Sequence, residues 1–150
     1  MMGAPAVYLA GPMKGLTFEA CNRWRIEAAF RLGERGIATI NPVEAELIAH
    51  QGALSCSGNG MMTSPKAIVA KDRHYVLNRA TAMLVNFTDA PAVSIGTCVE
   101  FGWADAARIP VVTVLPDANP HHHAFIRELS GWVVADLNDA IGILAALHKD

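Results

Sequence analysis

Short apolar runs alternate along this chain with segments of helical spacing, and most of the runs end at a glycine, proline or asparagine. The apolar runs cover residues 6–10, 37–41, 81–87, 111–115 and 131–135. The helical segments cover residues 17–36, 43–50, 66–80, the region around Glu100 and 136–150. Strands that alternate with helices form mostly parallel sheets with helices on both faces. The sequence therefore predicts a three-layer, doubly wound α/β fold of the flavodoxin or Rossmann type, with a five-stranded, mostly parallel sheet.

Composition narrows the class of protein. The 150 residues are predicted to form one domain over 1–150, and 52% hydrophobic residues against 17% charged residues argue against disorder. A net charge of −2 offers no basic surface for polymeric nucleic acid, although a single nucleotide remains compatible. We expect no membrane span and no signal peptide, because no apolar run is long enough and the N-terminus has no basic start. Three cysteines without a CxxC pair favour a cytoplasmic protein without disulfides or structural zinc.

Two glycine-containing segments follow predicted strands and are candidates for binding a ligand. The segment GPMKG (11–15) follows the first strand, and NFTDAPAVSIGT (86–97) follows the third and leads into a helix. Doubly wound folds bind ligands beyond the carboxyl ends of their strands, so both segments should lie at the same end. Gly11 and Gly15 allow the backbone to approach a ligand closely. GPMKG lacks the spacing of a P-loop, so hydrolysis of nucleoside triphosphates is not indicated.

Ser94 stands where the helix after the third strand is predicted to begin. Free backbone N–H groups at such a position, as in Ser94 to Thr97, favour an anion. The Ser94 hydroxyl could help to hold a phosphate, or Ser94 or Thr97 could simply cap the helix.

Glu100 lies in the same predicted helix among small or apolar neighbours. A carboxylate in such surroundings is costly to desolvate unless another group compensates it. Glu100 is therefore either a residue at the rim of an amphipathic helix or a functional acid. Its place in the first turns of the helix is expected to help keep it ionised.

Several segments together resemble the nucleoside 2-deoxyribosyltransferase superfamily. They are VYLAGPMKG (7–15), a following Asn-Pro pair, Asp72 in a helix before an apolar strand, and SIGTCVEFGWADAARIPVVTV (94–114). The resemblance extends from Val7 to Leu144. Its members include transferases that exchange bases and 2'-deoxynucleoside 5'-phosphate N-hydrolases. The resemblance implies that Glu100 is the catalytic nucleophile and that Asp72 and Tyr8 occupy the other catalytic positions.

The chemistry of N-glycosidic cleavage agrees with these residue types. Positive charge develops on the sugar, and a carboxylate such as Glu100 can stabilise it and bond to the anomeric carbon. Asp72 would protonate the departing base, and Tyr8 would donate a hydrogen bond that orients Glu100. The structural alternatives are that Asp72 only pairs with Lys71 or Arg73, and that Tyr8 is a core residue.

The residue six positions before the glutamate separates the two branches of the superfamily. The transferases carry an aspartate there, whereas the hydrolases carry a serine that contacts the 5'-phosphate, as Ser94 would. Lys14 stands where the hydrolases have an arginine, and Pro12 replaces one of their serines. Ser130 loosely matches a serine that comes from a neighbouring subunit, which implies a homodimer or higher oligomer. The resemblance and the loop chemistry together indicate seven candidates for binding the substrate, which are Gly11, Met13, Lys14, Gly15, Ser94, Gly96 and Ser130.

We therefore expect an N-glycosidase of nucleotide salvage that hydrolyses a (deoxy)nucleoside 5'-monophosphate, with no cofactor and no metal. The alternatives are a transferase that exchanges bases on 2'-deoxynucleosides, and a catalytically silent nucleotide-binding sensor. The sequence leaves the base and the sugar open.

Three further features are predicted to be structural or stay without a role. The run His121 to His123 is not expected to bind a metal, because adjacent residues of regular structure cannot all face one ion. Trp24 and Arg25 are expected at the surface or at a subunit interface. The segment 51–65 is predicted to be a long loop, whose role stays open.

Overall fold

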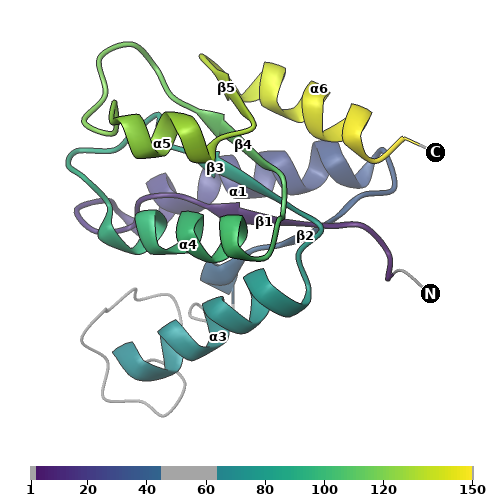
Figure 1. The fold of residues 1–150 in the computed structure, drawn as a ribbon, viewed down its shortest axis with the longest axis horizontal. Coiled ribbons are helices and arrows are strands. Elements are labelled where there is room, and N and C mark those ends of the chain that lie inside the picture. The colour runs from purple at the N-terminus through teal and green to yellow at the C-terminus, as the bar shows by residue number, and fades with distance from the viewer. Residues whose placement is uncertain (1–2, 45–63, 150) are drawn as a thin grey trace.

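The protein contains a single parallel sheet, seen in a computed structural model that describes residues 3–44 and 64–149. Its order is β2-β1-β3-β4-β5, and every pair of neighbouring strands is parallel (Figure 1). The strands are β1 (Ala6–Ala10), β2 (Ala38–Ile40), β3 (Ala82–Asn86), β4 (Val111–Val114) and β5 (Trp132–Val134). The predicted five-stranded, doubly wound α/β fold is therefore confirmed. The segments predicted as a helix over 43–50 and a loop over 51–65 lie mostly outside the described residues.

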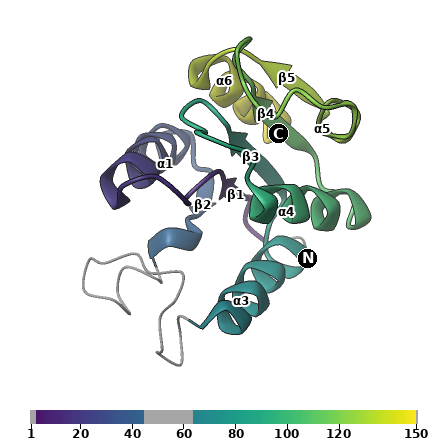
Figure 2. The same ribbon diagram turned by 90° about the vertical axis from the view of Figure 1, so that its left-hand side faces the viewer.

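Helices cover both faces of the sheet, and Figure 2 shows the two layers. The helices α1 (Phe18–Gly33) and α6 (Leu137–Leu147) pack on one face. The helices α3 (Pro65–Asn78), α4 (Ile95–Ala106) and α5 (Ala124–Leu129) pack on the other. The predicted N-caps are confirmed at Thr17 and Asp136, whose side chains accept hydrogen bonds from the backbone of the first turns of α1 and α6. Such caps cost about 1 kcal/mol to remove.

Side-chain alternation along the strands divides the core into two parts. Val7 and Leu9 of β1 point towards α1 and α6, whereas Tyr8 and Ala10 point towards α3, α4 and α5. Strands of a parallel sheet are buried on both faces, which explains their nearly continuous apolar sequences. Tyr8 is thus a polar group placed in the middle of an otherwise apolar layer.

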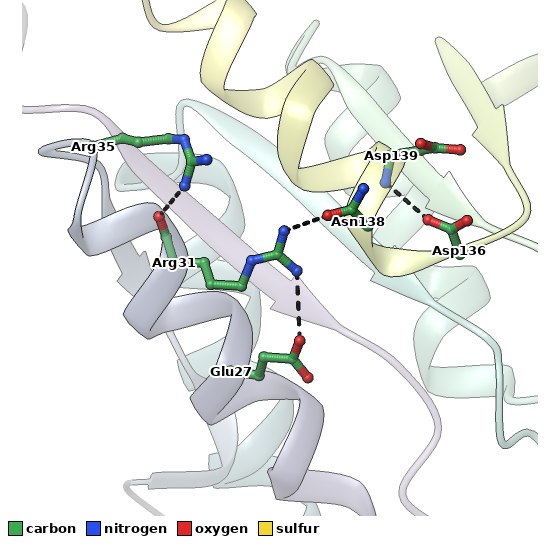
Figure 3. A network of polar contacts seen from close by, with 6 residues as sticks. All are labelled: Glu27, Arg31, Arg35, Asp136, Asn138 and Asp139. Carbon is green, nitrogen blue, oxygen red and sulfur yellow. Dashed lines mark hydrogen bonds and ion pairs between the residues drawn. The ribbon is translucent and has the colours of Figure 1, made fainter.

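The outer rim of the α1–α6 layer carries a network of polar contacts (Figure 3). Arg31 of α1 donates a 2.6 Å hydrogen bond to Asn138 of α6 and lies 3.5 Å from the carboxylate of Glu27. Arg35 donates to the carbonyl oxygen of Arg31 at 2.7 Å. The network joins the C-terminal turns of α1 to the N-terminal turn of α6, on the side of the molecule away from Glu100.

The sheet has its topological switch point between β1 and β3. The chain leaves β1 towards β2 on one side and returns to β3 on the other, so the loops after β1 and β3 diverge. The two strand ends approach closely, because a Cβ atom at Gly11 would lie only 2.9 Å from the carbonyl oxygen of Asn86. Gly15 has a φ of +82°, a conformation that favours glycine. Ligands of doubly wound folds bind at such a point, so a ligand site is expected here.

Candidate active site

A buried hydrogen bond joins the central strand to helix α4. The hydroxyl of Tyr8 donates to Oε1 of Glu100 at 2.7 Å. Tyr8 is fully buried, and Glu100 is 9% exposed. The hydrogen bond expected from the sequence is therefore present in the structure, between residues 92 positions apart in the chain.

The packing of α4 places Glu100 against the sheet. Thr97, Phe101 and Ala104 are buried on the same side of this helix, at positions three or four residues from Glu100 or next to it. Phe101 and Ala104 contact the apolar layer that also contains Tyr8. The carboxylate is therefore directed into the core by the same face that anchors the helix.

Burial determines the protonation of Glu100. The pKa of its carboxyl group is raised to about 8, mainly by loss of hydration and in smaller part by the charge of Asp72. The hydrogen bond from Tyr8 and the positive charges of Arg25 and Lys71 lower the pKa of Glu100 but do not cancel the effect of burial. The start of the helix favours the ionised form, but it does not keep Glu100 ionised, because desolvation is the larger effect.

Tyr8 stays a hydrogen-bond donor over the whole physiological pH range. Burial, followed by the charges of Glu100 and Asp72, raises the pKa of its hydroxyl well above the usual value near 10. A neutral phenol can therefore donate to Glu100 whether the carboxyl group is ionised or not. The bond is stronger when the acceptor is charged, so it favours the carboxylate form.

Asp72 lies on helix α3, which packs beside α4. The Nζ atom of Lys71 lies 3.0 Å from Oδ1 of Asp72 and donates to the carbonyl oxygen of Pro42 at 2.7 Å. The pairing with Lys71 that the sequence allowed is therefore present. The charge of Asp72 also raises the pKa values of Tyr8 and Glu100, so the two carboxyl groups act on one another. The role of Asp72 as a proton donor stays a prediction.

Arg25 is a buried residue of the site that the sequence analysis placed elsewhere. It was expected at the surface or an interface, but it is only 1% exposed. Its guanidinium donates to the carbonyl oxygens of Leu9 at 3.2 Å and Gly11 at 3.0 Å, and also to that of Cys21. Arg25 thus holds the carboxyl end of β1, while its charge lowers the pKa of Glu100.

The helical spacing of α1 contained the signal for this burial. Cys21, Ala28 and Leu32 are buried on α1, and Arg25 lies four residues after Cys21 on the same face. A single arginine in an apolar helical stripe is rarely buried without partners. The partners here are backbone carbonyls, which the sequence pattern does not display. Trp24, its neighbour, is partly buried against the α1–α6 core, and the Arg25 guanidinium lies 4.6 Å from its ring centre.

The loop after β1 presents the first group of predicted binding residues. Gly11 is buried between the strand ends, Met13 is half-buried, and Lys14 and Gly15 are exposed. The carbonyl oxygen of Met13 accepts a 3.1 Å hydrogen bond from the backbone of Leu16, which closes a turn. Lys14 forms no ion pair with any described residue, so its charge is available at this end of the sheet.

Ser94 is the N-cap of α4, as one of the two alternatives proposed. Its Oγ accepts a 3.4 Å hydrogen bond from the backbone of Thr97 and lies 2.9 Å from the Thr97 hydroxyl. Ser94 is half-buried, and Gly96 is exposed in the first turn. Capping does not exclude contact with a ligand, because a serine hydroxyl accepts two hydrogen bonds and donates one.

Ser130 ends α5, and its hydroxyl is engaged within its own subunit. It donates to the carbonyl oxygen of Ile126 at 2.6 Å and lies 2.7 Å from the hydroxyl of Thr113 on β4. The structure therefore connects Ser130 to the sheet rather than to the loops after β1 and β3.

A hollow lies at the switch point, on the side of α1. Its walls come from the loop after β1, from α1 and from the end of β3, and its lining residues are Pro12, Leu16, Ala20, Trp24, Asn86 and Asp89. Glu100 and Tyr8 lie on the opposite face of the sheet. The hollow and the Tyr8–Glu100 pair therefore lie on opposite sides of the sheet.

The three consecutive histidines have separate partners. His121 is buried, His122 lies 2.8 Å from the carbonyl oxygen of Pro116, and His123 caps α5. Within residues 3–44 and 64–149, no group of three or more His, Cys, Asp or Glu side chains could hold a metal ion. None of the helices in the described part of the chain is both long enough and apolar enough to cross a membrane.

Two solved structures share this fold over nearly the whole chain. A conserved protein from Enterococcus faecalis V583 superimposes with a TM-score of 0.68 and 20% identity, covering 93% of this chain and 96% of that one. The CMP N-glycosidase of Clostridium botulinum superimposes with a TM-score of 0.59 and 19% identity, covering 95% and 98%. No protein-family model and no curated protein sequence matches the chain. At these identities the likeness shows a common fold.

Proposed function

We propose that this protein is an N-glycosidase that releases the base from a nucleoside 5'-monophosphate, with a 2'-deoxynucleotide as the expected substrate. The observation that carries the proposal is the buried Tyr8–Glu100 hydrogen bond beside a second carboxyl group, Asp72. Two carboxyl groups in one site are what glycoside cleavage requires. The shared fold with a CMP N-glycosidase supports the same class of reaction.

In the first step the Glu100 carboxylate attacks the anomeric carbon of the sugar. The bond between this carbon and the base nitrogen breaks, its electron pair leaves with the base, and Asp72 supplies the proton that neutralises the base. A glycosyl ester of Glu100 results. In the second step water attacks the anomeric carbon, the ester bond breaks, and the water proton returns to Asp72.

This cycle needs one proton on the pair of carboxyl groups. Because burial raises the pKa of Glu100 to about 8, the free protein at neutral pH holds a proton on Glu100. Tyr8, Arg25 and Lys71 all favour the ionised form, and positive charge on the sugar favours it further as the bond breaks. We therefore propose that substrate binding moves the proton from Glu100 to Asp72 and so prepares both groups.

The loops after β1 and β3 supply the proposed contacts to the 5'-phosphate. Ser94 offers a hydroxyl at the start of α4, and Lys14 offers an unpaired positive charge among the described residues. A hydroxyl can donate to phosphate, whereas an acidic residue at this position would repel it. Ser94 therefore favours a monophosphate over an unphosphorylated nucleoside, and hydrolysis over exchange of bases.

The test compares nucleosides with their 5'-monophosphates on the parent protein, Ser94→Ala and Ser94→Asp. Base release is measured with and without a second base as acceptor. Loss of a hydrogen bond to a charged group corresponds to about 1.5–3 kcal/mol, so Ser94→Ala should weaken monophosphate binding about ten- to a hundredfold. Ser94→Asp should reject monophosphates, because it brings a like charge next to the phosphate.

Asp136→Ala serves as the matched control, because it removes the N-cap of α6 on the other face of the sheet. It should lower stability without changing the preference for phosphate. A parent protein that prefers nucleosides and transfers deoxyribose to the added base would replace the hydrolase with the transferase. A parent protein that binds nucleotides without releasing base would support the sensor alternative.

A further inference from the structure

His121 lies buried where the loops after β3 and β4 meet the start of α4. The residue is 1% exposed, and its ring stacks on Phe87 with ring centres 3.8 Å apart and planes 14° from parallel. Its Nε2 atom lies 2.8 Å from the backbone nitrogen of Ser94. Its Nδ1 atom lies 3.0 Å from Oδ1 of Asn119. In the sequence this histidine is marked only by its place in a run of three.

These contacts allow one tautomer of the His121 ring. The backbone N–H of Ser94 can only donate, so Nε2 must be the unprotonated acceptor. The hydrogen of the neutral ring is then on Nδ1, where it donates to Asn119. The amide nitrogen of Asn119 donates to the carbonyl oxygen of Phe87 at 2.7 Å, so the Asn119 oxygen is directed towards His121. Burial also lowers the pKa of His121, in agreement with a neutral ring.

The His121 ring therefore fixes the backbone of Ser94 by accepting a hydrogen bond from its N–H group. Ser94 caps α4 with its side chain, while its own backbone N–H is bound by His121. The stack with Phe87 connects this contact to the end of β3, and Asn119 connects it to the loop after β4. Displacement of the Ser94 backbone, and of the hydroxyl that it carries, thus requires the loss of a partly buried hydrogen bond.

We propose that His121 is a positioning residue that holds Ser94 in place for recognition of the 5'-phosphate. The inference rests on the proposed function of Ser94, and it adds a residue that acts through Ser94 rather than on the substrate. Its acceptor nitrogen, and not merely its ring volume, is the property that matters.

The test uses two variants of His121 that differ in this property. His121→Gln retains an acceptor oxygen close to the position of Nε2, whereas His121→Leu fills the space without an acceptor. We expect His121→Leu to raise the KM for a monophosphate about tenfold with little change in kcat, the size of effect that loss of one partly buried hydrogen bond allows. His121→Gln should restore most of the parent KM. An unchanged KM in His121→Leu, or an equal loss in His121→Gln, would overturn the proposal.

Two measurements on the folded protein separate this inference from the proposed function. Nitrogen NMR of the parent should show an unprotonated Nε2 on His121, and the opposite tautomer would overturn the proposal. Should the parent release no base, the proposed function fails, and titration with deoxyribose 5-phosphate, followed through the Ser94 amide signal, decides the inference. Weaker binding to His121→Leu than to the parent supports it, and equal binding overturns it.

A variant of Asn119, the partner of His121 Nδ1, controls for a folding defect in His121→Leu. Asn119→Ala removes the acceptor of Nδ1–H, together with the Asn119 hydrogen bonds to the Phe87 carbonyl oxygen and from the His121 backbone, but it keeps the His121 ring itself. If His121→Leu does not fold, Asn119→Ala should raise the KM in the same direction by a smaller factor, and an unchanged KM would contradict the proposal.

Discussion

The two helical layers of this protein bury different kinds of side chain against one sheet. The layer of α1 and α6 packs apolar residues on β1, β3 and β4. Its one buried charge in the described part of the chain, Arg25, reaches carbonyl groups at the end of β1. The layer of α3, α4 and α5 buries Glu100 and His121 beside its apolar residues, and Tyr8 faces it from the sheet.

On the proposed function, the layer of α1 and α6 mainly stabilises the fold, whereas the layer of α3, α4 and α5 carries the reacting groups. Apolar burial contributes about 25 cal/mol for each Å² removed from water, whereas a buried carboxyl group is costly. The polar network on the rim of α1 and α6 adds little, because exposed ion pairs contribute about 0–1 kcal/mol (Figure 3). The layer of α3, α4 and α5 bears the cost of burying Glu100, whereas the opposite layer buries no carboxyl group among the described residues.

The largest expected effect comes from Glu100→Gln in the polar layer. This substitution keeps the size of the side chain but removes the nucleophile, so base release should fall about a thousandfold or more. Asp105→Asn, on the exposed side of the same helix, is the control and should retain parental turnover. Near-parental base release by folded Glu100→Gln would exclude the proposed mechanism.

Leu144→Ala tests the apolar layer. Leu144 is fully buried on α6, so the truncation should lower the free energy of unfolding by about 2–5 kcal/mol. Leu147→Ala, at a 40% exposed position of the same helix, should have a much smaller effect. Turnover per folded molecule should stay at the parental level, and a large loss of turnover with unchanged stability would contradict the division between the layers.

The pH dependence of stability measures the cost of burying Glu100. Its pKa is about 8 in the folded protein, against about 4.3 in an unfolded chain, so only the folded state holds the proton between these values. The contribution of Glu100 to the free energy of unfolding is therefore complete below about pH 4 and is lost as the pH rises through 8. Glu100→Gln should reduce the loss of stability between pH 5 and 8 by about 2–4 kcal/mol. Urea denaturation of both proteins at several pH values measures how the free energy of unfolding changes with pH. The same pH dependence in both proteins would contradict the burial of an acid.

The smallest expected effect is that of Tyr8→Phe. The hydrogen bond from Tyr8 lowers the pKa of Glu100, so its loss should disfavour the carboxylate and should move the alkaline fall of kcat/KM, where the carboxyl pair loses its proton, to higher pH. At neutral pH the variant should be about tenfold slower, which corresponds to about 1.4 kcal/mol. The two proteins should converge at alkaline pH, where Glu100 is ionised in both. A pH-independent loss would mean that Tyr8 acts on the substrate rather than on the carboxyl group.

Local patterns in the sequence were sufficient to predict the five strands, the helices α1, α3, α4 and α6, and the class of fold. The apolar run at 6–10 and the caps at Thr17 and Asp136 depend on residues close together in the chain. Predicted boundaries differ from the observed ones by at most three residues, as at α1, which was expected over 17–36 and covers Phe18–Gly33. Helix ends are least certain because their last turns depend on contacts outside the helix.

The candidate site was only partly accessible to the same reasoning. Glu100 and Ser94 stand out locally, because a lone carboxylate among apolar residues and a serine at a helix start are visible in the sequence. The role of Arg25 does not stand out in the sequence, because its partners are the carbonyl oxygens of Leu9, Gly11 and Cys21. Backbone groups of distant residues leave no trace in the pattern of side chains.

The sequence by itself determined that strands alternate with helices, because periodicity and caps are properties of neighbouring residues. Only the tertiary structure decided that Tyr8 and Glu100, 92 positions apart, share a hydrogen bond. It also decided the protonation of Glu100, since the helix position favours the charged form and burial outweighs it. Desolvation depends on everything packed around a group, and that sum exists only once the chain has folded.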